Sequence, residues 1–170
     1  MKAKASILFG AVFFILVNCF GDGSSDVDKA VGGSANMAVI VNPDSVDAWR
    51  TVASLKQEYK QGFQMPELLQ KAGKPITVSK DLAAQLAKLL EDPHTYLRPG
   101  TSFKDCIPVP DVVIAFMRGN REVDVYLCFE CKVLIVEQVQ SDIDRGRPAI
   151  LKVVKQMLPN DPLIQSLKDQ

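Results

Sequence analysis

The chain has 170 residues, with 20 basic and 20 acidic side chains and therefore a formal net charge of zero. No basic run or basic patch stands out along the sequence, which argues against nucleic acid as a partner. The length suits one ordinary domain, and no internal repeat is visible. The sequence also lacks a glycine-rich loop of the kind that binds phosphate groups.

The first residues have the pattern of an export signal. Lys2 and Lys4 form a short positive segment, and residues 7–17 are then an unbroken apolar stretch. A helix of that length rises about 16 Å, which is shorter than the bilayer's hydrocarbon core of about 30 Å. We therefore predict that residues 1–18 are a signal peptide rather than a transmembrane anchor or a buried core helix.

A cysteine follows this apolar stretch. Leu16-Val17-Asn18-Cys19 resembles the lipobox of bacterial lipoproteins, in which the cysteine receives a diacylglycerol group and becomes the mature N-terminus. Asn18 stands where such motifs usually have Gly, Ala or Ser; the alternative is an ordinary signal cleaved near Gly21. The resemblance implies that Cys19 carries the lipid and anchors the protein to the cell membrane or the outer membrane. The domain then lies in the periplasm or at the cell surface.

The segment after Cys19 is rich in glycine and serine. Residues 19–36 include Gly21, Gly23, Gly32 and Gly33, together with three serines. Such a composition buries too little apolar surface to offset the entropy lost on ordering the chain. We therefore predict a flexible spacer over residues 19–36, followed by a single domain over residues 37–170.

The clearest sequence signal in that domain is that of a β-hairpin. Residues 112–116 have the composition of a strand, Gly119-Asn120 is a two-residue turn signal, and residues 123–129 alternate. With Gly119 and Asn120 as the loop, apolar side chains pair on one face: Phe116 with Val123, Ile114 with Val125, and Val112 with Leu127, together with Phe129. The opposite face carries Glu122, Asp124 and Tyr126, so register and burial agree. Residues 133–136 are predicted as a further strand.

Capping residues indicate three helices. Ser79 is predicted to cap a helix that runs to about Glu91, and a second helix begins near Pro148. Asp161-Pro162 predicts the cap and first turn of a short final helix through Leu167. The less regular segments are predicted as a strand at 37–41, a strand or a helix at 46–55, a short helix at 66–72 and a short strand at 76–78. The whole predicts an α+β fold, in which helices cover one face of an antiparallel sheet.

The cysteines of the domain favour a disulfide. Cys128 and Cys131 form a C-x-x-C at the end of a predicted strand, where residues three apart point to opposite faces unless a bulge or turn intervenes. Alternation puts Cys131 on the core face with Leu127 and Phe129, and Cys106 shares that face. Because export permits disulfides, we predict Cys106–Cys131, with Cys106–Cys128 as the alternative. The third thiol is predicted to be buried.

Metal and catalytic chemistry have weaker support. Cys106, Cys128, Cys131 and the single histidine, His94, would make a Cys₃His zinc set, but His94 and Cys106 lack the spacing of a zinc knuckle. We therefore expect no cofactor, with zinc as the alternative. His94 sits in a helix-ending turn, where a solvated side chain is the simpler interpretation. Three carboxylates, those of Glu122, Asp124 and Glu130, resemble a catalytic pair, but a solvent-exposed strand face explains them without chemistry.

From Ser79 onward the chain resembles a group of uncharacterised bacterial secreted proteins and lipoproteins. The resemblance rests on four motifs: Asp92-Pro93-x-x-Tyr96, Lys104-x-Cys106-x-Pro108, Leu127-Cys128-Phe129-Glu130-Cys131 and Pro159-Asn160-Asp161-Pro162-x-Ile164-Gln165. It implies a shared fold over about half of the chain. The group has no known activity, so the resemblance implies no substrate or catalytic residue.

Three functions compete on this evidence. The first is a non-enzymatic lipoprotein of the cell envelope, whose domain is a binding or structural module. The second is a thiol-redox or zinc-binding protein that uses Cys106, Cys128 and Cys131. A periplasmic hydrolase is the weakest of the three, because no catalytic constellation is visible in the sequence.

Overall fold

A computed structural model of the chain describes residues 25–52, 54, 69–97, 100 and 106–168. Its centre is an antiparallel sheet with the strand order β2-β1-β3-β4-β5-β6. The strands are β1 (Ser45–Thr51), β2 (Lys71–Thr77), β3 (Val112–Arg118), β4 (Arg121–Cys128), β5 (Val133–Val136) and β6 (Val139–Asp142).

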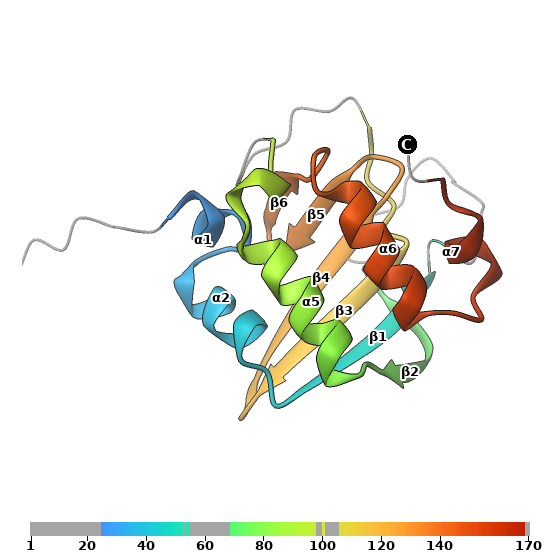
Figure 1. The fold of residues 1–170 in the computed structure, drawn as a ribbon, viewed down its shortest axis with the longest axis horizontal. Coiled ribbons are helices and arrows are strands. Elements are labelled where there is room, and N and C mark those ends of the chain that lie inside the picture. The colour runs from blue at the N-terminus through green and yellow to red at the C-terminus, as the bar shows by residue number, and fades with distance from the viewer. Residues whose placement is uncertain (1–24, 53, 55–68, 98–99, 101–105, 169–170) are drawn as a thin grey trace, which may run out of the picture.

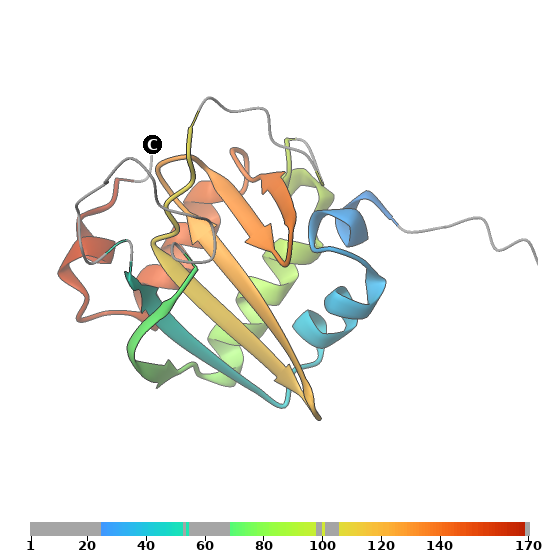
Figure 2. The same cartoon turned by 180° about the vertical axis from the view of Figure 1, so that it is seen from behind.

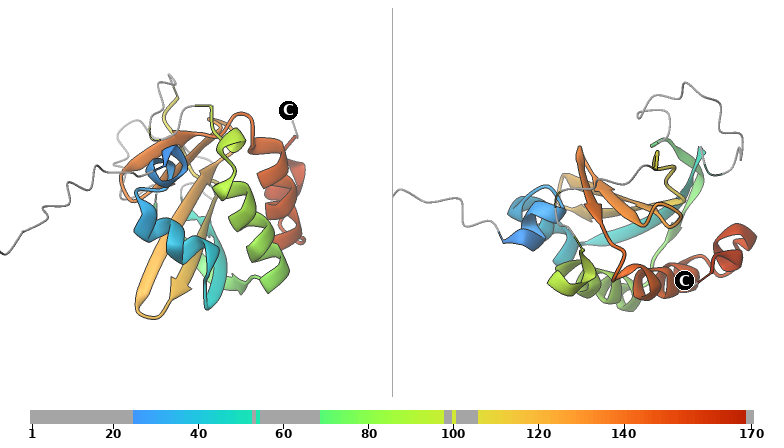
Figure 3. Two further views of the ribbon diagram at one scale, coloured as in Figure 1. Left: turned by 60° about the vertical axis from the view of Figure 1, so that its left-hand side comes forward. Right: turned by 90° about the horizontal axis from the view of Figure 1, so that it is seen from above.

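Helices cover one face of this sheet, as the predicted α+β fold requires. Figure 1 shows α2, α5 and α6 lying across the near face, and the view from above in Figure 3 separates the helical layer from the strands. The helices are α1 (Asp26–Ala30), α2 (Ser34–Val41), α5 (Lys80–Glu91), α6 (Arg147–Met157) and α7 (Pro162–Ser166), with a 3₁₀ turn η1 (Pro93–Thr95). No described helix is long and apolar enough to cross a membrane.

The predicted hairpin is confirmed in register and in burial. Strands β3 and β4 pair Phe116 with Val123, Ile114 with Val125, and Val112 with Leu127. Gly119 begins the two-residue turn with a φ of +57°, a conformation that glycine adopts without steric cost. All of these apolar side chains, and Phe129, are buried in the main hydrophobic core under the helices. We call this helix-covered side the inner face of the sheet and the opposite side the outer face.

The predicted helix caps are also confirmed. The Ser79 hydroxyl accepts a hydrogen bond from the backbone N–H of Leu82, and α5 then runs to Glu91. Pro148 lies in the first turn of α6, where its missing N–H removes no helical hydrogen bond. Asp161 caps α7 by accepting from the N–H groups of Leu163 and Ile164.

Two predictions near the N-terminus are wrong. Residues 25–36 of the predicted spacer are folded, because Ser25 and Asp28 form a capping box that starts α1. Ala30 and Val31 are completely buried in the main core, so α1 belongs to the domain. Residues 37–41 lie in helix α2 rather than in a strand. Residues 19–24 of the predicted spacer lie outside the described residues.

The strands in the middle of the chain also differ from the prediction. Residues 45–51 form strand β1, which resolves the choice left open for 46–55 within the described residues. Lys71 and Ala72, predicted to end a helix, begin strand β2 instead, and this strand continues through Thr77. Residues 69 and 70 of that predicted helix are not helical either, and residues 66–68 lie outside the described residues. Strand β6 was not predicted from the sequence.

Candidate functional site

The structure joins Cys106 to Cys131 in a disulfide, which is the pairing that the sequence favoured. The two Cα atoms are 5.9 Å apart, within the range of a disulfide, and the residues are separated by 25 positions. Cys128 is a free, buried thiol, so the alternative pairing Cys106–Cys128 is not the one present. Cys19, the predicted lipidation site, lies outside the described residues.

A turn explains how the C-x-x-C reaches this arrangement. Residues 129–132 connect β4 to β5, and Lys132 has a φ of +56°. The turn interrupts the alternation of the strand, so Cys131 is not on the inner face with Leu127 and Phe129 as predicted. Cys131 instead packs with Cys128, Val133 and the partly buried Cys106 in a separate cluster. The pairing was therefore predicted on a partly wrong argument about faces.

The free thiol of Cys128 has low reactivity at neutral pH. Burial is the main cause that raises its pKa to about 11, and the negative charges of Asp111 and Glu130 act in the same direction. The backbone N–H groups of Cys131 and Val109 oppose this shift. Because the thiolate is the nucleophile and the metal ligand, a raised pKa limits both reactions at neutral pH.

The predicted zinc ligands do not form a metal site. His94 is exposed on η1, and its ring Nδ1 lies 3.0 Å from the Asp92 carboxylate. The disulfide occupies two of the three cysteines. In the part of the chain that the structure describes, no three His, Cys, Asp or Glu side chains come together closely enough to hold a metal ion.

The outer face carries a polar cluster centred on Lys71. The ammonium of Lys71 forms ion pairs with Glu122 and with Asp124, where Nζ and Oδ1 are 2.8 Å apart. It also lies 4.6 Å from the ring centroid of Trp49, a cation–π distance. The Tyr126 hydroxyl donates to the other carboxylate oxygen of Asp124 across 3.2 Å. We call these five residues the ammonium cluster.

Burial and charge perturb the acids of the ammonium cluster in opposite directions. Burial is the main cause that raises the pKa of Asp124, while the hydrogen bond from Lys71 lowers the pKa of the exposed Glu122. Burial opposes the charged form of Lys71, but hydrogen bonds to both acids raise its pKa overall. The cluster is therefore a partly buried setting that stabilises a positive charge between two carboxylates and over one aromatic ring, that of Trp49.

Sequence reasoning found only part of this cluster. Glu122, Asp124 and Tyr126 were predicted to share an outer face, and β4 places them there. Trp49 and Lys71 were missed, because they reach the face from β1 and β2, whose pairing has no local sequence signal. Glu130, grouped with the other acids from the sequence, lies instead on the turn after β4.

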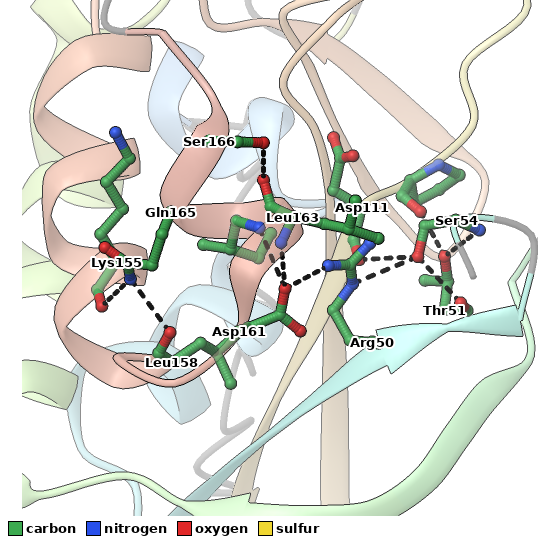
Figure 4. Close-up of polar contacts among 12 residues, drawn as sticks. Arg50, Thr51, Ser54, Asp111, Lys155, Leu158, Asp161, Leu163, Gln165 and Ser166 are labelled. Atoms are coloured by element: carbon green, nitrogen blue, oxygen red, sulfur yellow. Dashed lines mark hydrogen bonds and ion pairs between the residues drawn. The ribbon is translucent and has the colours of Figure 1, made fainter. Parts of the chain in front are cut away.

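A second polar network fixes the C-terminal helix to the sheet. Arg50 of β1 donates from Nη1 to Asp161 Oδ1 across 2.7 Å, and the same oxygen caps α7 (Figure 4). Arg50 Nε also donates to the Ser54 hydroxyl, whose proton is directed to backbone carbonyls. Gln165 donates to the carbonyls of Lys155 and Leu158 at the end of α6. These contacts are structural, because each polar group is satisfied within the fold.

The motif Asp92-Pro93-x-x-Tyr96 also has a structural role. Asp92 accepts from the backbone N–H of His94 across 2.8 Å, and the buried Tyr96 hydroxyl donates to the Leu90 carbonyl. Thr95 packs against Gly146, where an added Cβ would lie only 2.5 Å from a Thr95 side-chain carbon. The motif therefore closes α5 and docks it against the start of α6.

Comparison with known proteins does not identify the chain. No protein-family model matches it, and neither the curated proteins nor the solved structures contain a significant match. No family is therefore assigned, and the resemblance to bacterial secreted proteins and lipoproteins stays a prediction. The function has to be argued from the residues themselves.

Proposed function

We propose that the protein is an exported lipoprotein, anchored through Cys19, whose domain is a non-enzymatic binding module of the cell envelope. The observation that carries the binding role is the setting of the Lys71 ammonium, which pairs with two carboxylates and lies over the Trp49 ring, while the Tyr126 hydroxyl donates to one of those carboxylates. We further propose that this cluster recognises a partner's primary ammonium group, such as a lysine side chain.

The proposed location, outside the cytosol and anchored to a membrane, rests on two features. Leu16-Val17-Asn18-Cys19 stands at the end of an apolar stretch that is too short to span a bilayer. The Cys106–Cys131 disulfide is of the kind that forms and persists outside the reducing cytosol. Together they support an exported domain that is held at a membrane by lipid.

The proposed recognition rests on the negative charge of the cluster and on replacement of the Lys71 ammonium by a ligand ammonium. Without Lys71, the cluster would present Glu122 and Asp124 beside Trp49 and Tyr126, a combination that attracts an ammonium ion. Lys71 comes from the edge strand β2, whose last five residues are exposed and whose pairing with β1 is irregular. The chain's own lysine therefore acts as a resident cation that a ligand ammonium can replace.

Trp49 provides a direct test, because it is the only tryptophan of the chain. The mature protein is titrated with Nα-acetyl-lysine amide and with the Nε-acetylated form, which lacks the charge. We expect a saturable change in Trp49 fluorescence with the charged compound alone.

Matched variants make this test decisive. Lys71→Met is expected to strengthen binding about tenfold or more, because it removes the resident cation, and Asp124→Asn to abolish it. Lys74→Met, an exposed lysine of the same strand, serves as the control. Equal binding by Lys71→Met and the parent protein would refute this recognition site.

The anchor has its own test. Cys19→Ser is expected to abolish labelling by radioactive palmitate and to release the protein from the membrane fraction. Cys128→Ser is the matched control, since that thiol is buried and should not affect lipidation. Unchanged labelling of Cys19→Ser would remove the lipoprotein proposal while leaving the ammonium cluster untouched.

A further inference from the structure

The three cysteines of the domain lie together on the outer side of the sheet. Cys106 and Cys131 are bonded, and Cys128 packs against them with Val133. The turn at residues 129–132 brings the two ends of the C-x-x-C to the same cluster. A third sulfur is therefore present beside the disulfide rather than elsewhere in the core.

The sulfur of Cys128 lies between the two chain segments that the disulfide joins. The backbone N–H of Cys131 donates to it across 3.4 Å. From the other segment, the backbone N–H of Val109, three residues after Cys106, acts to lower the pKa of this thiol. Both N–H groups favour negative charge on the sulfur, and the thiolate is the form that attacks a disulfide.

The two sulfurs of the disulfide differ in their access to solvent. Cys131 is buried, whereas Cys106 is partly exposed and is followed by the exposed Ile107. A thiolate that leaves from Cys106 can be solvated, but one left at Cys131 would remain buried. Exchange at Cys131 is therefore favoured over exchange at Cys106.

We propose that Cys128 exchanges with the disulfide, giving a second covalent form with a Cys128–Cys131 bond and a free thiol at Cys106. The Cys128 thiol releases its proton to solvent, and the thiolate attacks the sulfur of Cys131. As this bond forms, the Cys106–Cys131 bond breaks, and Cys106 leaves as a thiolate that takes up a proton. One disulfide and one thiol are present before and after, so the step needs no oxidant or reductant.

The exchange moves the free thiol from the interior to an accessible position. In the second form, Cys106 can react with a disulfide that an envelope partner presents, forming a mixed disulfide. Burial of Cys128, with the charges of Asp111 and Glu130, raises the pKa of this thiol to about 11. Exchange is therefore slow at neutral pH. Its rate rises about tenfold for each unit by which the pH increases toward the pKa of the thiol.

The test is alkylation of the native, full-length mature protein in detergent. The protein is incubated with iodoacetamide without reductant at pH 7, 8 and 9, and peptide mass mapping identifies the alkylated cysteine and the disulfide. We expect alkylated Cys106 together with a Cys128–Cys131 bond. The rate should rise about tenfold per pH unit and should not depend on protein concentration.

A variant separates exchange from simple opening of the domain. Cys128→Ser retains the Cys106–Cys131 disulfide but has no attacking thiol, so Cys106 should not be alkylated at any of these pH values. The wild-type peptide map decides the question alone if that variant does not fold. Alkylation of Cys128 with the Cys106–Cys131 bond intact would overturn the proposal, as would an unmodified Cys106 at pH 9.

Discussion

The two faces of the sheet are stabilised in different ways. The inner face buries large apolar side chains under α2, α5 and α6, including Phe116, Leu127 and Phe129. The outer face, seen from behind in Figure 2, buries smaller side chains such as Val113 and Ala115. It adds the disulfide, the free thiol and the ammonium cluster to them.

This difference separates contacts that tolerate change from contacts that do not. Apolar burial is non-directional and is roughly proportional to the area removed from water. A disulfide or an ion pair depends on two particular residues, and a half-exposed ion pair contributes little to stability. The inner face is therefore the main source of stability from apolar burial, and the outer face is where specific chemistry lies.

The largest expected effect tests the inner face directly. Phe129→Ala removes a completely buried aromatic side chain and leaves a cavity, so we expect a loss of about 3–5 kcal/mol in the free energy of unfolding. Urea unfolding followed by circular dichroism measures this loss. Met117→Ala, at a partly exposed position of β3, is the control. A loss below about 1 kcal/mol at Phe129 would contradict the assignment of the core.

The disulfide is expected to be the strongest single contribution of the outer face. Closing a loop of 25 positions stabilises the fold by about 3 kcal/mol, mainly through the unfolded chain. A reductant should therefore lower the melting temperature of the protein, whereas a chelator should not change it. Cys106→Ser should melt lower and should not respond to the reductant. Stabilisation by zinc instead of by oxidation would produce the reverse pattern.

Asp111 gives a pH-dependent test near the cysteines. Burial is the main cause that raises its pKa, against the N–H of Phe129 and the charges of Arg50 and Arg147. The folded state therefore holds this proton more tightly. Stability contributed by the protonated form is lost as pH rises from about 3.9 through the folded-state pKa. Asp111→Asn should thus gain stability relative to the parent protein between pH 4 and pH 7.

Urea titrations at both pH values measure this relative gain. Asp92→Asn is an opposite control, because the backbone N–H of His94 lowers the pKa of the exposed Asp92. The Asp92 carboxylate contributes stability above its unfolded pKa, and that contribution is lost as the pH falls through its folded-state pKa. The same stability difference at pH 4 and pH 7 for Asp111→Asn would show that its burial does not penalise the charge.

The smallest effect is expected from the exposed rim of the ammonium cluster. Glu122→Ala should change the free energy of unfolding by no more than about 0.5 kcal/mol, because exposed ion pairs are weak. The same urea experiment measures it. A loss larger than that of Phe129→Ala would mean that the hairpin register is shifted by one residue.

The inner face could be predicted because its signals are local. A two-residue loop at Gly119 and Asn120 fixes the register of β3 and β4, and one face then has to be apolar throughout. The helices after Ser79 and Asp161 are predictable from the capping side chains at their N-termini. None of these features requires knowledge of a distant residue.

The errors occurred where the deciding contacts are distant or the pattern is short. Residues 37–41 are an apolar run that fits a strand or a helix, and packing against the sheet decides it. Strand β2 contains Gly73 and Pro75, which usually mark breaks, but an edge strand tolerates both. Lys71 lies over Trp49 and reaches the acids of β4 only through the order of strands in the sheet.

One oxygen of Asp161 links the end of the chain to its first strand. It caps α7 and also accepts from Arg50, a residue 111 positions earlier. During synthesis, β1 leaves the ribosome long before the residue that holds Arg50 has been made. The domain therefore completes this contact only when nearly all of its residues are available.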